Sequence, residues 1–284
     1  HDVVVIQNIK IKIYRIYLKI IMQLEKEISM QIIDININNI DNEHICCSIS
    51  EKKGENCVFS KKAWMKNNFD KGLVFKRFDV RGKAFIEYIP AENAWCPITA
   101  DNYIFINCFW ISGKFKGQGY SNLLLQECVD DAKSKGKYGL VVLSSSKKMP
   151  FLSDAKYLKY KGFCLADTSE PNYELLYFPF TDNAPIPCFK NCVKQRKLNE
   201  NGIVLYYSNQ CPHTEKYAPI LKKIANSRGI DVNLIKFETA KEAQNAPAPF
   251  TTYSLFFNGE FVTNEILSEK KIEKFLDTNI KKFN

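Results

Sequence analysis

Two glycines and two lysines near the middle of the chain have the types and spacing of an anion-binding turn. Gly117 and Gly119 lack a Cβ, so a negatively charged group can approach their main chain closely, and Lys114 and Lys116 add positive charge beside it. A helix is expected directly after the turn, and its free N–H groups and positive dipole end would face the same spot. This combination favours a ligand that carries phosphate.

The elements around this turn form a βαβ unit. An apolar, aromatic-rich run over 103–111 predicts a buried strand that leads into the turn. The helix that follows carries apolar residues at helical spacing and is expected to end at Gly136. A second strand is predicted over 138–143, which completes the unit.

Two familiar nucleotide-binding patterns are absent from the turn. No Gly-Lys-Ser or Gly-Lys-Thr closes it, and Asn122 stands where a dinucleotide fingerprint needs its third glycine. The sequence therefore predicts neither a nucleoside triphosphate loop nor a dinucleotide site. A tight turn without any ligand is the alternative interpretation.

The turn resembles the acetyl-CoA site of the GNAT superfamily of N-acetyltransferases, whose pattern is Gln/Arg-x-x-Gly-x-Gly/Ala. The stretch 114–119 matches both glycines and has a lysine at the first position. A later stretch, 157–163, resembles the family's helix and the Gly-Phe pair after it. The resemblance implies acetyl-CoA as co-substrate, bound by Ile111, Lys114, Phe115, Lys116, Gly117, Gln118, Gly119, Tyr120 and Ser121.

The same resemblance leaves the catalytic acid and base open. A tyrosine four residues before the Gly-Phe pair often protonates the thiolate in this family, but Leu158 occupies that position here. Tyr157 and Tyr160 flank it, and neighbouring helix positions point about 100° apart. The acid is therefore one of these tyrosines after a helix shift, or another group such as a water; ordinary packing is the alternative interpretation of both tyrosines. Glu87, on a predicted strand, is the candidate base, and a solvated carboxylate is the alternative.

A second, smaller α/β domain is predicted over residues 201–284. Its expected element order, β-α-β-α-β-β-α, is that of a thioredoxin fold. The stretches 206–212, 249–259 and 261–267 resemble the YoaP-like domain that accompanies some bacterial GNAT domains. The predicted fold class is therefore α/β: a GNAT-type mixed sheet with helices on both faces, followed by a thioredoxin-like domain.

Cys211 occupies the position of the reactive cysteine in thioredoxin-like proteins. It precedes a helix, whose N-terminus is expected to lower the pKa of the thiol. Thr214 replaces the second cysteine of a Cys-x-x-Cys motif, so dithiol exchange within the motif is excluded. A monothiol activity and an inherited scaffold are the two remaining interpretations.

Composition bounds the remaining possibilities. A net charge of +9 is spread among mixed charges, which predicts a solvated basic surface and no nucleic-acid face. Ten cysteines without a Cys-x-x-Cys predict reduced thiols in a cytoplasm and no metal site. Residues 1–29 contain neither a signal core nor a membrane span and are expected to be a dispensable extension, with Met30 as the natural start. Residues 30–180 are the predicted GNAT domain, and 181–200 a linker.

The leading prediction is a cytoplasmic bacterial N-acetyltransferase that uses acetyl-CoA and acetylates a primary amine of a small molecule or peptide by direct attack on the thioester. One alternative is a thiol-redox protein that uses Cys211, with a GNAT domain that senses CoA. Another is a CoA-binding module that has lost catalysis. The sequence leaves the oligomeric state open.

Overall fold

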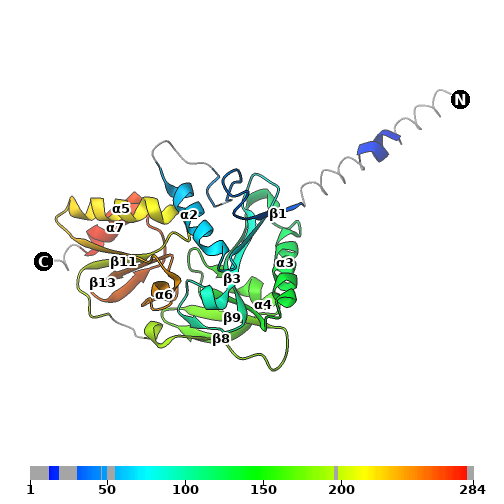
Figure 1. Cartoon of the computed structure of the whole chain (residues 1–284). Coiled ribbons are helices and arrows are strands. Elements are labelled where there is room, and N and C mark those ends of the chain that lie inside the picture. The colour runs from blue at the N-terminus through cyan, green and yellow to red at the C-terminus, as the bar shows by residue number, and fades with distance from the viewer. Residues whose placement is uncertain (1–12, 19–30, 46, 50–54, 195–197, 280–284) are drawn as a thin grey trace.

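A mixed sheet of eight strands is the larger of two main sheets in the computed structural model, which describes residues 13–18, 31–45, 47–49, 55–194 and 198–279 (Figure 1). Its order is β1-β2-β3-β5-β6-β9-β8, with β7 beside β6. Among the strand pairs described in this sheet, only β5–β6 and β6–β7 are parallel. The strands are β1 (Ile32–Ile35), β2 (Val74–Phe78), β3 (Ala84–Pro90), β5 (Tyr103–Ile111), β6 (Gly139–Ser145), β7 (Ser153–Asp154), β8 (Cys164–Ser169) and β9 (Tyr173–Pro179).

Successive side chains along a strand point to opposite faces of the sheet, and in the central strands both sets are apolar. Both faces of this sheet are therefore apolar. Ile104 and Ile106 of β5 belong to a core that includes α3 (Tyr120–Ser134) and Leu158 of α4 (Ala155–Tyr160). Tyr103 and Phe105 belong to the core on the opposite face, which includes α2 (Cys57–Phe69). β6 is buried along its whole length. The predicted mixed sheet with helices on both faces is confirmed.

A second sheet of four strands follows, in the order β12-β11-β13-β14. β11 is parallel to β12, whereas β11–β13 and β13–β14 are antiparallel. The strands and helices of this part are β11 (Ile203–Tyr207), α5 (Pro212–Asn226), β12 (Val232–Lys236), α6 (Ala240–Ala243), β13 (Tyr253–Phe257), β14 (Glu260–Thr263) and α7 (Glu269–Asn279). The element order predicted from the sequence is the one observed.

The small sheet packs one face on its own helices and the other on the large domain. Leu205 and Leu255 lie in a core with residues of α5 and α7. Val204, Tyr206 and Phe256, on the opposite face, belong to the same core as the second face of the large sheet. The C-terminal domain therefore covers that second face together with α2 (Figure 1).

Polar contacts join the two domains around this shared core. The Gln244 amide nitrogen donates to the carbonyl oxygens of Glu92 and Ala94 at 2.9 and 3.0 Å, and its oxygen accepts from Lys190 Nζ at 3.3 Å. Asn264 Nδ2 donates to the carbonyl oxygen of Pro150 at 2.7 Å. The interface is thus hydrogen-bonded as well as apolar.

The stretch expected to be a linker, 181–200, carries structure of its own in its described part. β10 (Cys188–Phe189) pairs with β4 (Ile98–Thr99), and one 3-10 turn, η3 (Asn191–Val193), follows. Asp167 Oδ2 accepts from the Phe189 N–H at 2.9 Å, and the Ser169 hydroxyl donates to the Val193 carbonyl at 2.8 Å. These bonds fix the stretch to the large domain, although its composition is that of a loop.

The structure describes only part of the regions on which the predictions about the N-terminus, the cysteines and a metal site depend. Of residues 1–29, only 13–18 are described; they form a short helix with exposed side chains. Within the described ranges, no helix has the length and apolarity that crossing a bilayer requires. The nine cysteines placed there are free, and no cluster of three or more ligating side chains suits a metal ion in those ranges.

We expect Gln244→Ala to lower the free energy of unfolding by about 1–2 kcal/mol, because it leaves two interdomain carbonyl groups without their donor. Gln126→Ala is the matched control, since the Gln126 amide donates to Asp130 on the exposed face of α3, and it should cost less than about 0.5 kcal/mol. Urea unfolding measures both. Equal effects of the two substitutions would show that Gln244 does not hold the domains together.

Candidate functional site

The predicted phosphate turn forms as a short 3-10 turn, η2 (Gly113–Phe115), followed by the N-terminus of α3. Gly117 has a φ of +74° and Gly119, the N-cap of α3, a φ of +87°. These values favour glycine. A Cβ at either position would meet nothing within 4 Å, so the space in front of both is open. An anion can therefore reach the main chain at the start of a 15-residue helix.

A cavity of about 510 Å³ lies in front of this turn. Seven of the nine residues predicted to bind the co-substrate line it: Ile111, Phe115, Lys116, Gly117, Gly119, Tyr120 and Ser121. Lys114 and Gln118 do not. The Gln118 amide donates to the Lys114 carbonyl at 2.5 Å, and Lys114 Nζ lies 5.3 Å from the Phe115 ring centroid. The structure thus brings most of the predicted binding residues together.

Tyr157 is the predicted tyrosine that faces this cavity. Asp154 caps its helix, accepting from the Tyr157 N–H at 3.0 Å. Leu158 is fully buried in the core and Tyr160 is 82% exposed, so the structure places Tyr160 outside the cavity. The Tyr157 hydroxyl is buried and makes no well-formed hydrogen bond with the described residues. Burial raises the pKa of Tyr157, and Ser121 partly offsets that rise.

The strand that borders the cavity, β5, is irregular at its centre. Its parallel pairing with β6 ends at Ile106 and Val142, after which β6 pairs with β7. Its register with β3 shifts there too, because Glu87 lies opposite Cys108 and Tyr88 opposite Ile106. Asn107 is therefore an extra residue, as in a β-bulge. β5 has no described partner on its β6 side beyond this point.

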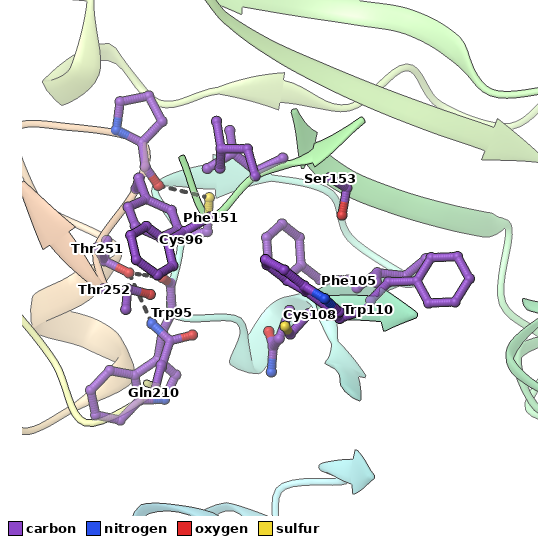
Figure 2. A pocket seen from close by; sticks show the side chains of 17 residues that line it. Trp95, Cys96, Phe105, Cys108, Trp110, Phe151, Ser153, Gln210, Thr251 and Thr252 are labelled. Carbon is purple, nitrogen blue, oxygen red and sulfur yellow. Dashed lines mark hydrogen bonds between the residues drawn. The ribbon is translucent and has the colours of Figure 1, made fainter. Parts of the chain in front are cut away.

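Two further cavities continue from the bulge to the domain interface. The first, of about 40 Å³, shares Phe109 and Ser153 with the cavity at the turn. Figure 2 shows its wall, with Trp110 and Cys108 on one side and Gln210, Thr251 and Thr252 on the other. The second, of about 110 Å³, shares Cys108, Trp110 and Gln210 with the first. We call this second cavity the interface chamber. A line of cavities thus runs from the glycine turn to the contact between the domains.

Glu87, the predicted base, lies in the interface chamber and is not a solvated carboxylate. It is only 2% exposed, and its Oε2 pairs with Lys61 Nζ at 2.6 Å. Its Oε1 accepts from Asn107 Nδ2 at 3.1 Å. Lys61 Nζ also lies 4.1 Å from the centroid of the Trp64 ring. The carboxylate is therefore held at the bulge by two donors, of which one is the buried cation Lys61.

Cys211 lies in the same chamber, but its ionisation differs from the prediction. Burial raises the pKa of the Cys211 thiol to about 12. The sequence-based expectation of a lowered pKa is therefore wrong, because removal of water outweighs the favourable end of α5. Cys47 and Cys108 also line the chamber, and the hydrogen bond with the Cys108 thiol, together with burial, raises the pKa of Cys47. Neither change favours thiolate chemistry at neutral pH.

Several residues that build the site were not found by sequence reasoning. Lys61 is one lysine in a helix without a clear apolar face, so no signal marks it as buried. Asn107 sits inside an apolar strand, where one polar residue indicates a bulge in hindsight. Phe250 and Thr252 reach the chamber from the other domain, and only the three-dimensional contact reveals this.

The comparisons with known proteins agree on the family. Residues 232–274 match the family model described as YoaP-like. The chain is 42% identical, over 246 residues, to "Uncharacterized N-acetyltransferase YoaP" of Bacillus subtilis strain 168; the match covers 87% of this chain and 98% of that protein.

Solved structures of the GNAT family resemble the chain only distantly. The Escherichia coli N-acetyltransferase YhbS in complex with CoA is 13% identical, with a TM-score of 0.38, over 56% of this chain and 89% of that one. The Staphylococcus aureus Mu50 acetyltransferase of the GNAT family is 13% identical, with a TM-score of 0.36, over 53% and 99%. At these scores the solved structures add nothing to the assignment. The identity to the Bacillus protein over nearly its whole length shows that this chain belongs to the YoaP family of N-acetyltransferases.

Proposed function

We propose that this protein transfers an acetyl group from acetyl-CoA to a primary amine by direct attack of the amine on the thioester. The observation that carries the proposal is the open space in front of Gly117 and Gly119, at a helix N-terminus and on the same cavity as Tyr157. Membership of a family of N-acetyltransferases supports it.

The residues at the turn fit the diphosphate of such a co-substrate. The main-chain N–H groups at the start of α3 would bind the anion, and Lys116 lies beside them in the same cavity. The edge of β5 beyond Ile106 leaves polar main-chain groups available for an extended ligand arm. Acetyl-CoA supplies the activated acetyl group as a thioester.

The residues along the line of cavities have matching roles in acetyl transfer. The amine nitrogen bonds to the acetyl carbon as the carbon–sulfur bond breaks. Glu87 accepts the proton that the amine loses, and Tyr157 donates its hydroxyl proton to the leaving thiolate. The raised pKa of Tyr157 keeps the hydroxyl protonated at neutral pH. Solvent returns a proton to Tyr157 and takes one from Glu87. Tyr160 is left out of these roles because it faces solvent.

The thiol-redox alternative has less support from the site. The Cys211 thiol, with a pKa of about 12, is almost entirely protonated at pH 7. Thr214 is buried, and its hydroxyl donates to the Cys211 carbonyl at 2.7 Å. It therefore stabilises the main chain at the start of α5. The free thiols of the described residues support our proposal that the protein works in a reducing cytoplasm.

We expect Gly117→Glu to weaken acetyl-CoA binding at least tenfold more than Gly117→Gln does. The two side chains place the same strain on a φ of +74°, so they differ only by the charge that repels a diphosphate. Titration calorimetry gives both affinities, and circular dichroism confirms that both variants fold. Equal affinities of the Glu and Gln variants, or no binding by the parent, would refute the phosphate site.

We expect Tyr157→Phe to lower kcat by about 10²-fold or more, as loss of a general acid does, with little change in acetyl-CoA affinity. Tyr160→Phe makes the same chemical change on the exposed side and should leave kcat unchanged. The readout is acetylation of the best amine in a panel of primary amines.

The pH dependence of kcat follows from the same group. Because burial raises the pKa of Tyr157 above its ordinary value, which is about 10, this acid should cause no alkaline fall in kcat below about pH 10. A fall near pH 8 that is absent in Tyr157→Phe would contradict the assignment.

We expect iodoacetamide at pH 7 to modify Cys211 about a hundredfold or more slowly than the exposed Cys164, because the raised pKa of Cys211 leaves little thiolate. Peptide mass spectrometry of the native protein over time measures both rates. Modification of Cys211 faster than Cys164 would instead favour the thiol-redox function.

A further inference from the structure

The floor of the interface chamber is one face of two strands with an ordered sequence of side chains. Lys83, just before β3, and Phe85 and Glu87 within it all line the chamber, as alternate residues on one strand face do. Across the pair, Cys108 lies opposite Glu87 and Trp110 opposite Phe85. The floor therefore runs from a carboxylate at the bulge, over two aromatic rings, to a lysine.

The roof of the chamber comes from the C-terminal domain. Gln210, Phe250 and Thr252 line it from that side. The Gln210 amide nitrogen donates to Ser208 Oγ at 3.1 Å and to Thr251 Oγ1 at 3.0 Å. The Thr251 hydroxyl in turn donates to the Trp95 carbonyl of the large domain (Figure 2). The roof is thus bonded to the domain whose floor it covers.

One side wall, Phe151, depends on both domains. Its φ is +63°, which is uncommon for a residue other than glycine and is typical of functional sites. The carbonyl of the preceding Pro150 accepts from Asn264 of the C-terminal domain. Phe151 is 39% exposed and lines both cavities at the interface. The second domain therefore helps to hold an aromatic side chain at the chamber.

The two ends of the chamber differ in polarity. At the bulge, Asn107 Oδ1 is buried and has no hydrogen-bond partner among the described residues, so it can accept from an N–H group. At the other end, Lys83 Nζ lies 5.4 Å from the Trp110 ring centroid, and no described carboxylate pairs with it. Burial and the nearby Lys83 and Lys216 lower the pKa of His213, so this neighbour is neutral at pH 7. Lys83 is an available cation.

We propose that the interface chamber is the acceptor site and that its substrate is a small amine whose amino group is separated by a flat apolar body from an anionic group. The amino group lies at Glu87 and Asn107, beside the irregular point of β5. The body lies between Trp110 and Phe250, and the anion meets Lys83. This inference rests on the proposed acetyl transfer and adds that the YoaP-like domain contributes to acceptor selectivity.

Two primary amines of the same shape test the anionic group. They are 4-(aminomethyl)benzoate and 4-methylbenzylamine, which differ by a carboxylate and a methyl group. With acetyl-CoA saturating, we expect kcat/KM to favour the benzoate by about tenfold or more, as one charged contact does. Lys83→Met should remove that preference while leaving acetyl-CoA affinity unchanged. Equal kcat/KM for both amines in the parent, or a preference that survives in Lys83→Met, would overturn the assignment of Lys83.

A second pair of variants tests the roof. Phe250→Ala is expected to raise KM for both amines about fivefold or more by removing apolar contact, without changing acetyl-CoA affinity. Phe275→Ala is the matched control, because this partly buried phenylalanine of the same domain packs on Phe257, away from the chamber. Equal effects of the two variants on KM would show that the YoaP-like domain does not form part of the acceptor site.

Binding separates a failure of this inference from a failure of the proposed function. If neither amine is acetylated, calorimetry on the CoA-loaded protein decides. Binding of the benzoate, lost in Lys83→Met, supports the chamber. Absence of benzoate binding while acetyl-CoA still binds refutes the acceptor class and leaves the proposed function standing. Absence of acetyl-CoA binding refutes both.

Discussion

Apolar side chains on both faces of the central strands are the constraint on which the rest of the molecule depends. Strand alternation sends Ile104 and Ile106 to one side and Tyr103 and Phe105 to the other, and both sets are buried. α3 and α4 cover the first side. On the second, α2 covers part, and the small sheet covers more with Val204, Tyr206 and Phe256. The two domains therefore share a core.

This shared core determines the chemistry at the site. Because the C-terminal domain closes over β3 and β5, Glu87 is only 2% exposed and pairs with the buried Lys61 at 2.6 Å. The same loss of water raises the pKa of Cys211 and so removes the thiolate that its position suggests. Within one chamber, the Glu87 carboxylate is thus buried with an ion-pair partner, whereas burial suppresses the thiolate form of Cys211.

The sequence predicted what local patterns determine. The run over 103–111, the glycine turn and the helix after it follow from periodicity and glycine spacing, and the element order of the C-terminal domain follows in the same way. Seven of the nine residues expected at the turn line one cavity because neighbours in sequence lie together there.

Features that depend on distant contacts were not predictable. Lys61 and Glu87 are 26 positions apart in sequence, and each by itself suggests a solvated charge. The stretch over 181–200 has a loop's composition, yet β10 finds a partner in β4. Tyr157 faces the cavity and Leu158 the core because of how the short α4 sits on the sheet. The local sequence pattern of α4 does not predict which of its side chains faces the cavity.

The shared core also has a consequence for how the chain is made. The aromatic face that contains Phe105 leaves the ribosome well before Phe256, which helps to cover it. At about 5–20 residues per second, roughly 8–30 seconds separate the synthesis of these two positions. During that interval the first domain presents an open apolar surface to the cell. Folding of the first domain's core is therefore complete only when the last strands of the chain have been made and Phe256 has reached its place in that core.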